Sequence, residues 1–284
     1  MTAVPAAHRL PRLTKSMHGF VDGWNHLGSQ TAFYIRALGL VWDAVVRYRT
    51  ETLRLIANMS LGVGALAVIG GTVVIVVTLT MSTGGLVGIQ LYRSLSDVGV
   101  QALSGFASAY VNTRIASPLI ACVGLAATIG AGATAQLGAM RINEEIDALE
   151  VMGIRTITYL VSTRIVAGVV VVIPLWCMSA LAGYLSTRTL ITVIYGQAPG
   201  VYEHYFNTYL QPTDLFWSLF QVIAASITIM LVHTYYGFNA SGGPAGVGEA
   251  VGRAVRASLI VAVAVTLAVA LAAYGVSGDF NLSG

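Results

Sequence analysis

The most concentrated chemical groups in this chain are carboxylates in the stretch MRINEEIDALEVMGI, residues 140–154. Four of the protein's 12 acidic residues fall within seven positions there, namely Glu144, Glu145, Asp147 and Glu150. If residues 141–152 are helical, an apolar stripe runs along one side, formed by Ile142, Ile146, Leu149 and Met152. The pattern predicts a short amphipathic helix with an acidic face, although a solvated connecting helix would carry the same charges.

The sequence contains no motif that would support catalysis. A phosphate-binding loop needs GxxxxGK[ST], but the only lysine, Lys15, lies in LTKSM with no glycine-rich loop before it. HExxH, GxSxG and Cys/His clusters with metal-ligand spacing are also missing from the sequence. We therefore expect no enzyme activity, no catalytic or metal-binding residue and no cofactor in this chain.

The one titratable group that could serve ion-coupled transport is His233. Transporters driven by an ion gradient usually keep ionisable residues near the middle of the membrane, and the middle of every long apolar run here is uncharged. His233 lies near one end of its run, beside Tyr235 and Tyr236. We expect a hydrogen-bonded histidine at the membrane interface rather than a proton relay.

The elements that must position these groups are membrane spans. Of the 284 residues, 56% are hydrophobic and 10% are charged, whereas a soluble domain has about 25% charged residues. A span needs about 20 helical residues, and five uncharged runs are long enough: 55–92, 115–140, 165–187, 215–248 and 257–278. We predict an all-α membrane protein with five transmembrane helices. A short or re-entrant helix in SLSDVGVQALSGFASAYVNT would make six elements.

Basic residues predict the orientation, because cytoplasmic loops are enriched in Lys and Arg. With five spans and a cytoplasmic N-terminus, 12 of the 15 basic residues lie inside, and Arg93, Arg114 and Arg188 lie outside. The acidic helix is then cytoplasmic, and the final GDFNLSG is external. No apolar core with a cleavage site precedes Arg36, so we expect no cleaved signal.

Residues 33–56, FYIRALGLVWDAVVRYRTETLRLI, predict an amphipathic helix that lies in the cytoplasmic membrane interface. Its broad apolar face would comprise Phe33, Leu38, Trp42, Val45 and Leu53. Its arginines would lie at the level of the lipid phosphates: Arg36, Arg47, Arg49 and Arg54. A solvated N-terminal helix is the alternative.

Small residues are dense in two predicted spans, in GLAATIGAGATAQLG (124–138) and LGVGALAVIGG (61–71). Small residues let helix backbones approach closely in lipid, and the candidates for such packing include Gly124, Gly130, Gly132 and Gly138. Packing within the chain and packing against another subunit both remain open. Cys122 and Cys177 lie in predicted spans, where we expect buried, inert thiols rather than a disulfide.

Two blocks of the sequence resemble a known family. GAGATAQLGAMRINEEIDALEVMGIRTITYLVSTRIVAGVV (130–170) is similar to the signature region of the MlaE/YrbE permeases, the membrane subunits of ABC transporters that serve Mla and Mce lipid-transfer systems. YYGFNASGGPAGVGEAVGRAVRASLIVAVAVTLAVALAAYG (235–275) resembles the family's cytoplasmic loop and last span. The resemblance implies a basic cytoplasmic tail (1–32), a permease domain (33–276) and a short external tail (277–284).

The resemblance also implies that the acidic helix is a coupling helix, which docks in a groove of an ATPase partner. The coupling residues would be Arg141, Ile142, Glu144, Glu145, Ile146, Asp147, Ala148, Leu149, Glu150, Met152 and Gly153. Many relatives have Gln at the position of Glu145, and Pro is frequent at the positions of Thr156 and Thr163. These departures favour a diverged paralogue that pairs with an unlike second YrbE-like subunit, as in actinobacterial Mce systems.

The implied function is ATP-driven movement of a fatty acid, phospholipid or sterol-like lipid across the bacterial inner membrane. ATP and Mg²⁺ would bind to a partner ATPase dimer, external Mce-type proteins would exchange the lipid, and no nucleic acid would take part. Two alternatives stay open. A secondary lipid or drug transporter would depend on an ion gradient, and a non-transporting membrane anchor would tolerate alanine in the acidic helix.

Overall fold

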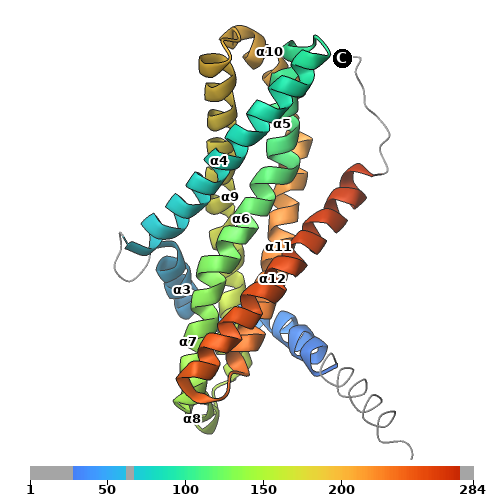
Figure 1. Cartoon of the computed structure of the whole chain (residues 1–284). Helices are drawn as coiled ribbons and strands as arrows, with labels where there is room; N and C mark the ends of the chain where they lie inside the picture. Colours follow the sequence, from blue (N-terminus) through green and yellow to red (C-terminus); the bar gives the residue numbers. More distant parts are fainter. Residues whose placement is uncertain (1–27, 62–66, 276–284) are drawn as a thin grey trace, which may run out of the picture.

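The computed structural model describes residues 28–61 and 67–275, and their side chains over 28–59 and 71–275. Within these ranges the fold is all-helical apart from turns (Figure 1). Five helical stretches are long and apolar enough to cross a membrane: Gly71–Asp97, Gln101–Ile142, Ile157–Ile194, Pro212–Phe238 and Gly243–Tyr274. The prediction of an all-α membrane protein with five spans is confirmed. Most of the basic tail, all of the C-terminal tail predicted to be external and residues 62–66 of LGVGALAVIGG lie outside the described residues.

Three spans are single α-helices: α4 (Ala67–Asp97), α11 (Pro212–Phe238) and α12 (Gly243–Tyr274). The second span consists of η1 (Gln101–Leu103), α5 (Ser104–Val111), η2 (Asn112–Ala116), α6 (Ser117–Gly124), η3 (Leu125–Gly130) and α7 (Ala131–Ile142). The third span consists of η4 (Ile157–Ser162), α9 (Thr163–Thr189) and η5 (Leu190–Ile194). The segments η2 to η5 are π-helical, a conformation that occurs mostly as single-turn insertions and often at functional sites.

The stretch SLSDVGVQALSGFASAYVNT does not form a separate helix. α4 ends at Asp97, Gly99 turns the chain at a φ of 77°, and the second span begins at Gln101. The six-element alternative is therefore not what the fold shows. Arg114 and Arg164, which the charge rule places in loops, lie inside the second and third spans. Each guanidinium has a partner within the protein: Arg114 donates a hydrogen bond to Asp214 at 2.9 Å, and Arg164 donates to the Leu160 carbonyl at 2.8 Å.

The second and third spans are longer than a membrane requires. Their 42 and 38 residues correspond to about 63 and 57 Å of helix, against about 30 Å of hydrocarbon. Both spans therefore extend beyond the bilayer core. The short helix α8 (Glu145–Val151) joins them at one end of the bundle, and α10 (Pro199–Tyr209) packs on α5 near the other (Figure 1). These two ends are called the α8 end and the α10 end.

The predicted interfacial helix is divided into three pieces. Residues 28–39 are helical, Leu40 forms a turn, α2 covers Val41–Arg47, Tyr48 forms a bend, and α3 covers Arg49–Leu61. The breaks let this segment follow the bundle surface, with the side chains of Ala37 and Ala44 fully buried. All four predicted interfacial arginines are exposed, and Trp42 is 76% exposed. The expected apolar face is split, because Phe33 packs inward against the Tyr235 and Phe238 rings.

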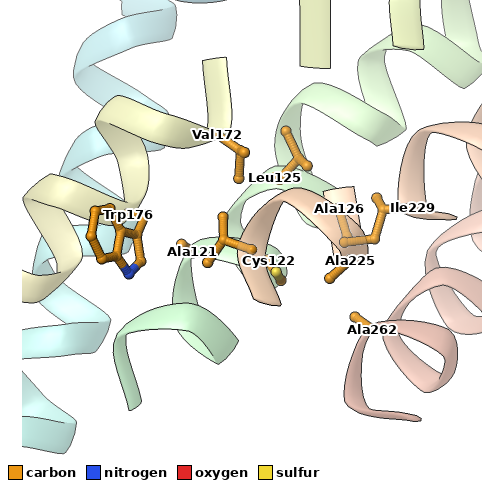
Figure 2. Close-up of a cluster of buried hydrophobic side chains, with 10 residues drawn as sticks. Ala121, Cys122, Leu125, Ala126, Val172, Trp176, Ala225, Ile229 and Ala262 are labelled. Carbon is orange, nitrogen blue, oxygen red and sulfur yellow. The ribbon is translucent and has the colours of Figure 1, made fainter. Parts of the chain in front are cut away.

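Four spans share the central core. Its buried side chains come from α6, η3, α9, α11 and α12 (Figure 2): Ala121, Cys122, Leu125, Ala126, Val172, Trp176, Val222, Ala225, Ile229 and Ala262. We compared how much of the most apolar stretch of each span is buried inside the protein. The buried share is 28% in the first span and 17% in the fifth, but 50–56% in the other three. α4 and α12 therefore present broad apolar faces outward. Cys122 is buried as expected, but the Cys177 thiol is on the exposed side of α9, and both are free.

Candidate functional site

The acidic stretch is not one helix over 141–152. α7 ends at Ile142, Glu144 adopts the left-handed conformation with a φ of 59°, and α8 begins at Glu145. A left-handed residue interrupts a right-handed helix, so Ile142 belongs to the preceding span and not to a stripe on α8. Gly153, at a φ of 78°, follows the end of α8. The result is a seven-residue helix set between two turns.

The apolar side of α8 is anchored to the ends of both adjoining spans. Ile146 is fully buried in a cluster with Leu137 of α7 and Leu160 of η4, and Leu149 packs against the same cluster. Burying such a side chain contributes about 1.5–3 kcal/mol. Met152, expected on this stripe, is instead 66% exposed. A displacement of α8 would therefore be felt by the second and third spans together.

The acidic side of α8 faces outward, and Glu144, Glu145, Asp147 and Glu150 are all exposed. Arg141 donates a hydrogen bond to Asp147, and the Thr156 hydroxyl donates to Glu150 Oε1 at 2.8 Å. Exposed ion pairs contribute only about 0–1 kcal/mol, so the Arg141–Asp147 contact can be exchanged readily for a contact with another protein. Val151, a residue that the sequence pattern did not single out, is 90% exposed and adds an apolar tip beside the acidic groups.

Three of the four singled-out glycines lie where helices of this same chain touch. A Cβ atom at Gly124 would collide with Val76 of α4, one at Gly130 with the His233 ring, and one at Gly138 with Val247 of α12. Around Gly132 there is open space within 4 Å. Contacts inside the chain thus account for the small side chains at three of these positions.

His233 joins three helices. Its Nδ1 lies 2.8 Å from the Thr134 hydroxyl of α7, and its Nε2 lies 3.0 Å from the Ser258 hydroxyl of α12. The ring is fully buried, so the expected hydrogen bonding is present but inside the bundle and not at its interface. Each hydroxyl can donate or accept, and the pair can satisfy both ring nitrogens of a neutral imidazole. Partners 99 and 25 residues away leave no local sequence signal.

Sequence reasoning missed a buried ion pair toward the α10 end. Arg114 Nη2 lies 2.9 Å from both carboxylate oxygens of Asp214, and the two side chains are 21% and 9% exposed. The guanidinium carbon also lies 4.1 Å from the Tyr110 ring centroid and 4.2 Å from that of Tyr274. These contacts connect the second, fourth and fifth spans. Because Asp214 follows Arg114 by 100 residues, no local pattern joins them.

An apolar pocket of about 170 Å³ opens between α3, α4, η3 and α9. Its lining is apolar except for one threonine hydroxyl, and consists of Met59, Thr72, Val73, Ile129, Val171, Pro174, Leu175 and Met178. Sites that enclose a drug-sized ligand measure about 300–1,000 Å³. This pocket alone is thus too small to enclose a whole lipid.

Comparison with known proteins matches residues 63–272 to the family described as Permease MlaE. A probable ABC transporter permease protein of Synechocystis is 27% identical over 176 residues, which cover 61% of this chain and 67% of that protein. A probable ABC transporter permease protein of Rickettsia bellii is 25% identical over 236 residues, 80% of this chain and 88% of the relative.

A plant protein is similar as well. The chloroplastic protein TRIGALACTOSYLDIACYLGLYCEROL 1 of Arabidopsis thaliana is 28% identical over 162 residues, 57% of this chain and 46% of the plant protein. The family match covers well over half of the chain and includes all of α8 and nearly all of the five spans. This chain, with its five spans and the surface helix between the second and third of them, belongs to the MlaE permease family of ABC transporter permeases.

Proposed function

We propose that this chain is the permease subunit of an ATP-driven lipid transporter, and that α8 is the helix through which a separate ATPase dimer acts on it. The observation that carries the proposal is the two-sided character of α8. Its acidic face is exposed, while Ile146 is buried between the ends of two spans. An ABC permease implies an ATPase partner, and ATP and Mg²⁺ would bind to that partner.

The proposed movement begins at α8. Nucleotide binding and hydrolysis would favour different positions of the ATPase subunits, and thereby different positions of α8. Because Ile146 contacts Leu137 and Leu160, the ends of the second and third spans would shift with it. No chemistry on the lipid is needed for this cycle.

A lipid is the proposed substrate because the outward faces of α4 and α12 and the lining of the pocket are apolar. The name of the Arabidopsis relative refers to a galactolipid. Since the pocket in this chain is smaller than a lipid site requires, a second permease subunit, in our proposal a YrbE-like paralogue, would complete the cavity. External Mce-type proteins would exchange a fatty acid, phospholipid or sterol-like molecule at the α10 end.

We further propose that the α8 end is cytoplasmic, in the bacterial inner membrane, because most of the described arginines gather there, whereas Arg93 and Arg188 are toward the α10 end. A cysteine at Asn207 of α10 should react with a membrane-impermeant thiol reagent in intact cells, and one at Asn143 should not. Both tests need the Cys177→Ser background, because that thiol is exposed. Reversed labelling would contradict the orientation.

The coupling role is tested by reversing Glu144, Asp147 and Glu150 to Lys together. All three are exposed and outside the spans, so the protein should still insert. Like-charge contacts across a docking groove cost several kcal/mol, so copurification of the ATPase and ATP-dependent lipid uptake should both fall at equal membrane abundance.

A matched control reverses exposed carboxylates far from α8, with Asp97→Lys and Glu203→Lys toward the α10 end. This variant should retain the ATPase. If the α8 variant copurifies the ATPase and transports lipid normally, α8 is only a connector. Uptake that persists without ATP and stops when the proton or sodium gradient is collapsed would favour a secondary transporter instead.

A further inference from the structure

Residues 28–48, here called the N-terminal arm, contact the start of the third span at three points. Arg155 Nη1 donates to Asp43 Oδ2 at 3.4 Å, the Tyr48 and Tyr159 rings meet edge to face with centroids 5.3 Å apart, and the Ser162 hydroxyl donates to the Ala37 carbonyl at 2.8 Å. Arg155 lies just before the third span, and Tyr159 and Ser162 lie in its first, π-helical turn η4. The arm therefore contacts the part of the chain that directly follows α8.

The bond from Ser162 is the most protected of these contacts. Ser162 and Ala37 are both fully buried. Ala37 lies in the last turn of helical residues 28–39, where carbonyls have no partner within the helix, so the Ser162 hydroxyl caps the helix from another element. Val161 and Ile165 surround Ala37 in the same apolar cluster. The side chains of Arg155 and Asp43 are more exposed, at 63% and 35%. An exposed pair adds little to the stability of the fold, so its role is to align the arm with the start of the third span.

The start of the third span is in turn joined tightly to α8. The amide of Ile154 donates to the Leu149 carbonyl at 3.0 Å, and the amide of Gly153 donates to the Glu150 carbonyl at 2.9 Å. The Thr156 hydroxyl donates to the Glu150 side chain at 2.8 Å. Hydrogen bonds thus join α8 to this turn, and the turn and η4 to the arm, so that these elements can move as one unit.

The arm also leads to the first span. It continues into α3, which contains Met59. The Met59 side chain packs against two apolar clusters, one that contains Ala37 and Val161 and one that contains Val76 of α4. Met59 further lines the apolar pocket, beside Thr72 and Val73 of α4. A route of packed residues therefore runs from α8 through the arm to a wall of the pocket.

We propose that the N-terminal arm moves with α8 as one unit and carries the ATPase-driven displacement to the first span and the apolar pocket, with Ser162 and the Asp43–Arg155 pair as its positioning residues. This inference rests on the proposed function of α8. It gives the arm a mechanical task in transport in addition to the interfacial position that the sequence predicts.

The first test measures lipid moved per ATP hydrolysed in the full reconstituted complex. Ser162→Val removes the buried donor and should lower this ratio about threefold to tenfold while ATPase copurification stays unchanged. Ser162→Thr keeps a hydroxyl and should retain the ratio. Ser179→Val is the matched control, because Ser179 is also fully buried and donates to the Ser117 carbonyl at 3.2 Å, between α9 and α6 and away from the arm.

If the Ser162→Val variant fails to assemble, the inference can still be tested by exchanging the charges of Asp43 and Arg155. Asp43→Arg and Arg155→Asp should each lower the ratio, and the double variant should restore it, because the exposed pair can re-form with its charges exchanged. A purely structural role would change abundance and not the ratio. Equal ratios in wild type, the Ser162→Val variant and both single charge variants would overturn the inference and leave the role of α8 intact.

Cross-linking tests whether the unit is rigid. Asp43→Cys and Arg155→Cys, bridged by a short bismaleimide in a Cys122→Ala, Cys177→Ser background, should transport lipid as well as the unbridged protein. Transport that stops on bridging would show that the arm and α8 must separate, and would overturn the inference. A wild-type complex that binds the ATPase but moves no lipid with ATP would overturn the proposed function and the inference together.

Discussion

Two ion pairs, one at each end of the bundle, are held in opposite ways, although the α10 end also carries an exposed pair, Arg188 with Glu203. At the α8 end, the side chains of Arg141 and Asp147 are 38% and 57% exposed. Toward the α10 end, Arg114 and Asp214 are only 21% and 9% exposed, and the Arg114 guanidinium lies over two tyrosine rings. Exposed pairs contribute about 0–1 kcal/mol, and breaking a buried pair costs about 3–5 kcal/mol. The Arg141–Asp147 pair is therefore suited to exchanging partners, and the Arg114–Asp214 pair to holding three spans at fixed positions.

The helices α8 and α10, at the two ends of the bundle, differ in how closely they pack against the spans. The apolar packing of α8 rests on Ile146 and Leu149, while α10 lies so close to α5 that a Cβ at Gly105 would collide with the Tyr202 carbonyl. The Tyr202 hydroxyl donates to Ser108 at 2.8 Å. Burial raises the pKa of Tyr202 to about 12, so the phenol keeps its proton and this contact throughout the physiological pH range.

The largest effect should follow from Asp214→Ala, which leaves Arg114 buried without its counter-ion. We expect a loss of about 3–5 kcal/mol in the free energy of unfolding, measured by reversible denaturation in mixed micelles. The double variant Arg114→Met, Asp214→Leu should recover most of it, since no charge is left unpaired. Asp147→Ala at the α8 end is the control. Equal losses for Asp214→Ala and Asp147→Ala would remove the contrast between the ends.

Gly105→Ala should have the next largest effect, because the added methyl group must push α10 away from α5. Overpacking of this kind costs about 1–3 kcal/mol, measured by the same unfolding assay. Gly132→Ala, at a helical position with open space around it, should be neutral or stabilising by up to about 1 kcal/mol. A neutral Gly105→Ala would show that the α10 contact yields easily.

Arg114→Lys should have a moderate effect. Lysine keeps the charge beside Asp214 but loses the planar guanidinium that lies over the Tyr110 and Tyr274 rings. Desolvated cation–π contacts are worth about 0.5–2 kcal/mol, so thermal inactivation should quicken without loss of membrane insertion. If the lysine variant is as stable as wild type, the site stabilises the protein through the ion pair with Asp214 alone and not through the tyrosine rings.

The smallest effect is expected for Asp147→Asn at the α8 end. It removes the exposed pair with Arg141, so stability should fall by no more than about 1 kcal/mol. The difference from wild type should shrink further at high salt, because exposed charges are screened. A loss as large as that of Asp214→Ala would mean that α8 depends on this pair for its position.

The five spans could be predicted because uncharged runs long enough to cross a bilayer are a local property of the sequence. The ends of the elements could not. The turn at Gly99 and the breaks at Leu40 and Tyr48 depend on how each segment meets the bundle. The local pattern of apolar residues contains no information about these contacts with the bundle.

The candidate site shows the same limit. The acidic residues of α8 and their exposure were predictable from composition, but the helix boundary at Glu144 is set by one left-handed residue. His233 and Arg114 could be noticed as single titratable residues. Their partners Thr134 and Asp214 lie 99 and 100 residues away, so only the folded chain shows whether such a group is a relay, a loop marker or a structural link.

The Arg114–Asp214 pair has a consequence for how the protein is made. Because 100 residues separate the two side chains, and synthesis adds about 5–20 residues per second, Arg114 leaves the ribosome about 5–20 seconds before its counter-ion. During this interval the second span carries an unpaired cation that lipid receives poorly. If Arg114 lies at hydrocarbon depth, we expect the second and third spans to stay beside the insertion machinery until the fourth arrives, so that the central three spans insert together.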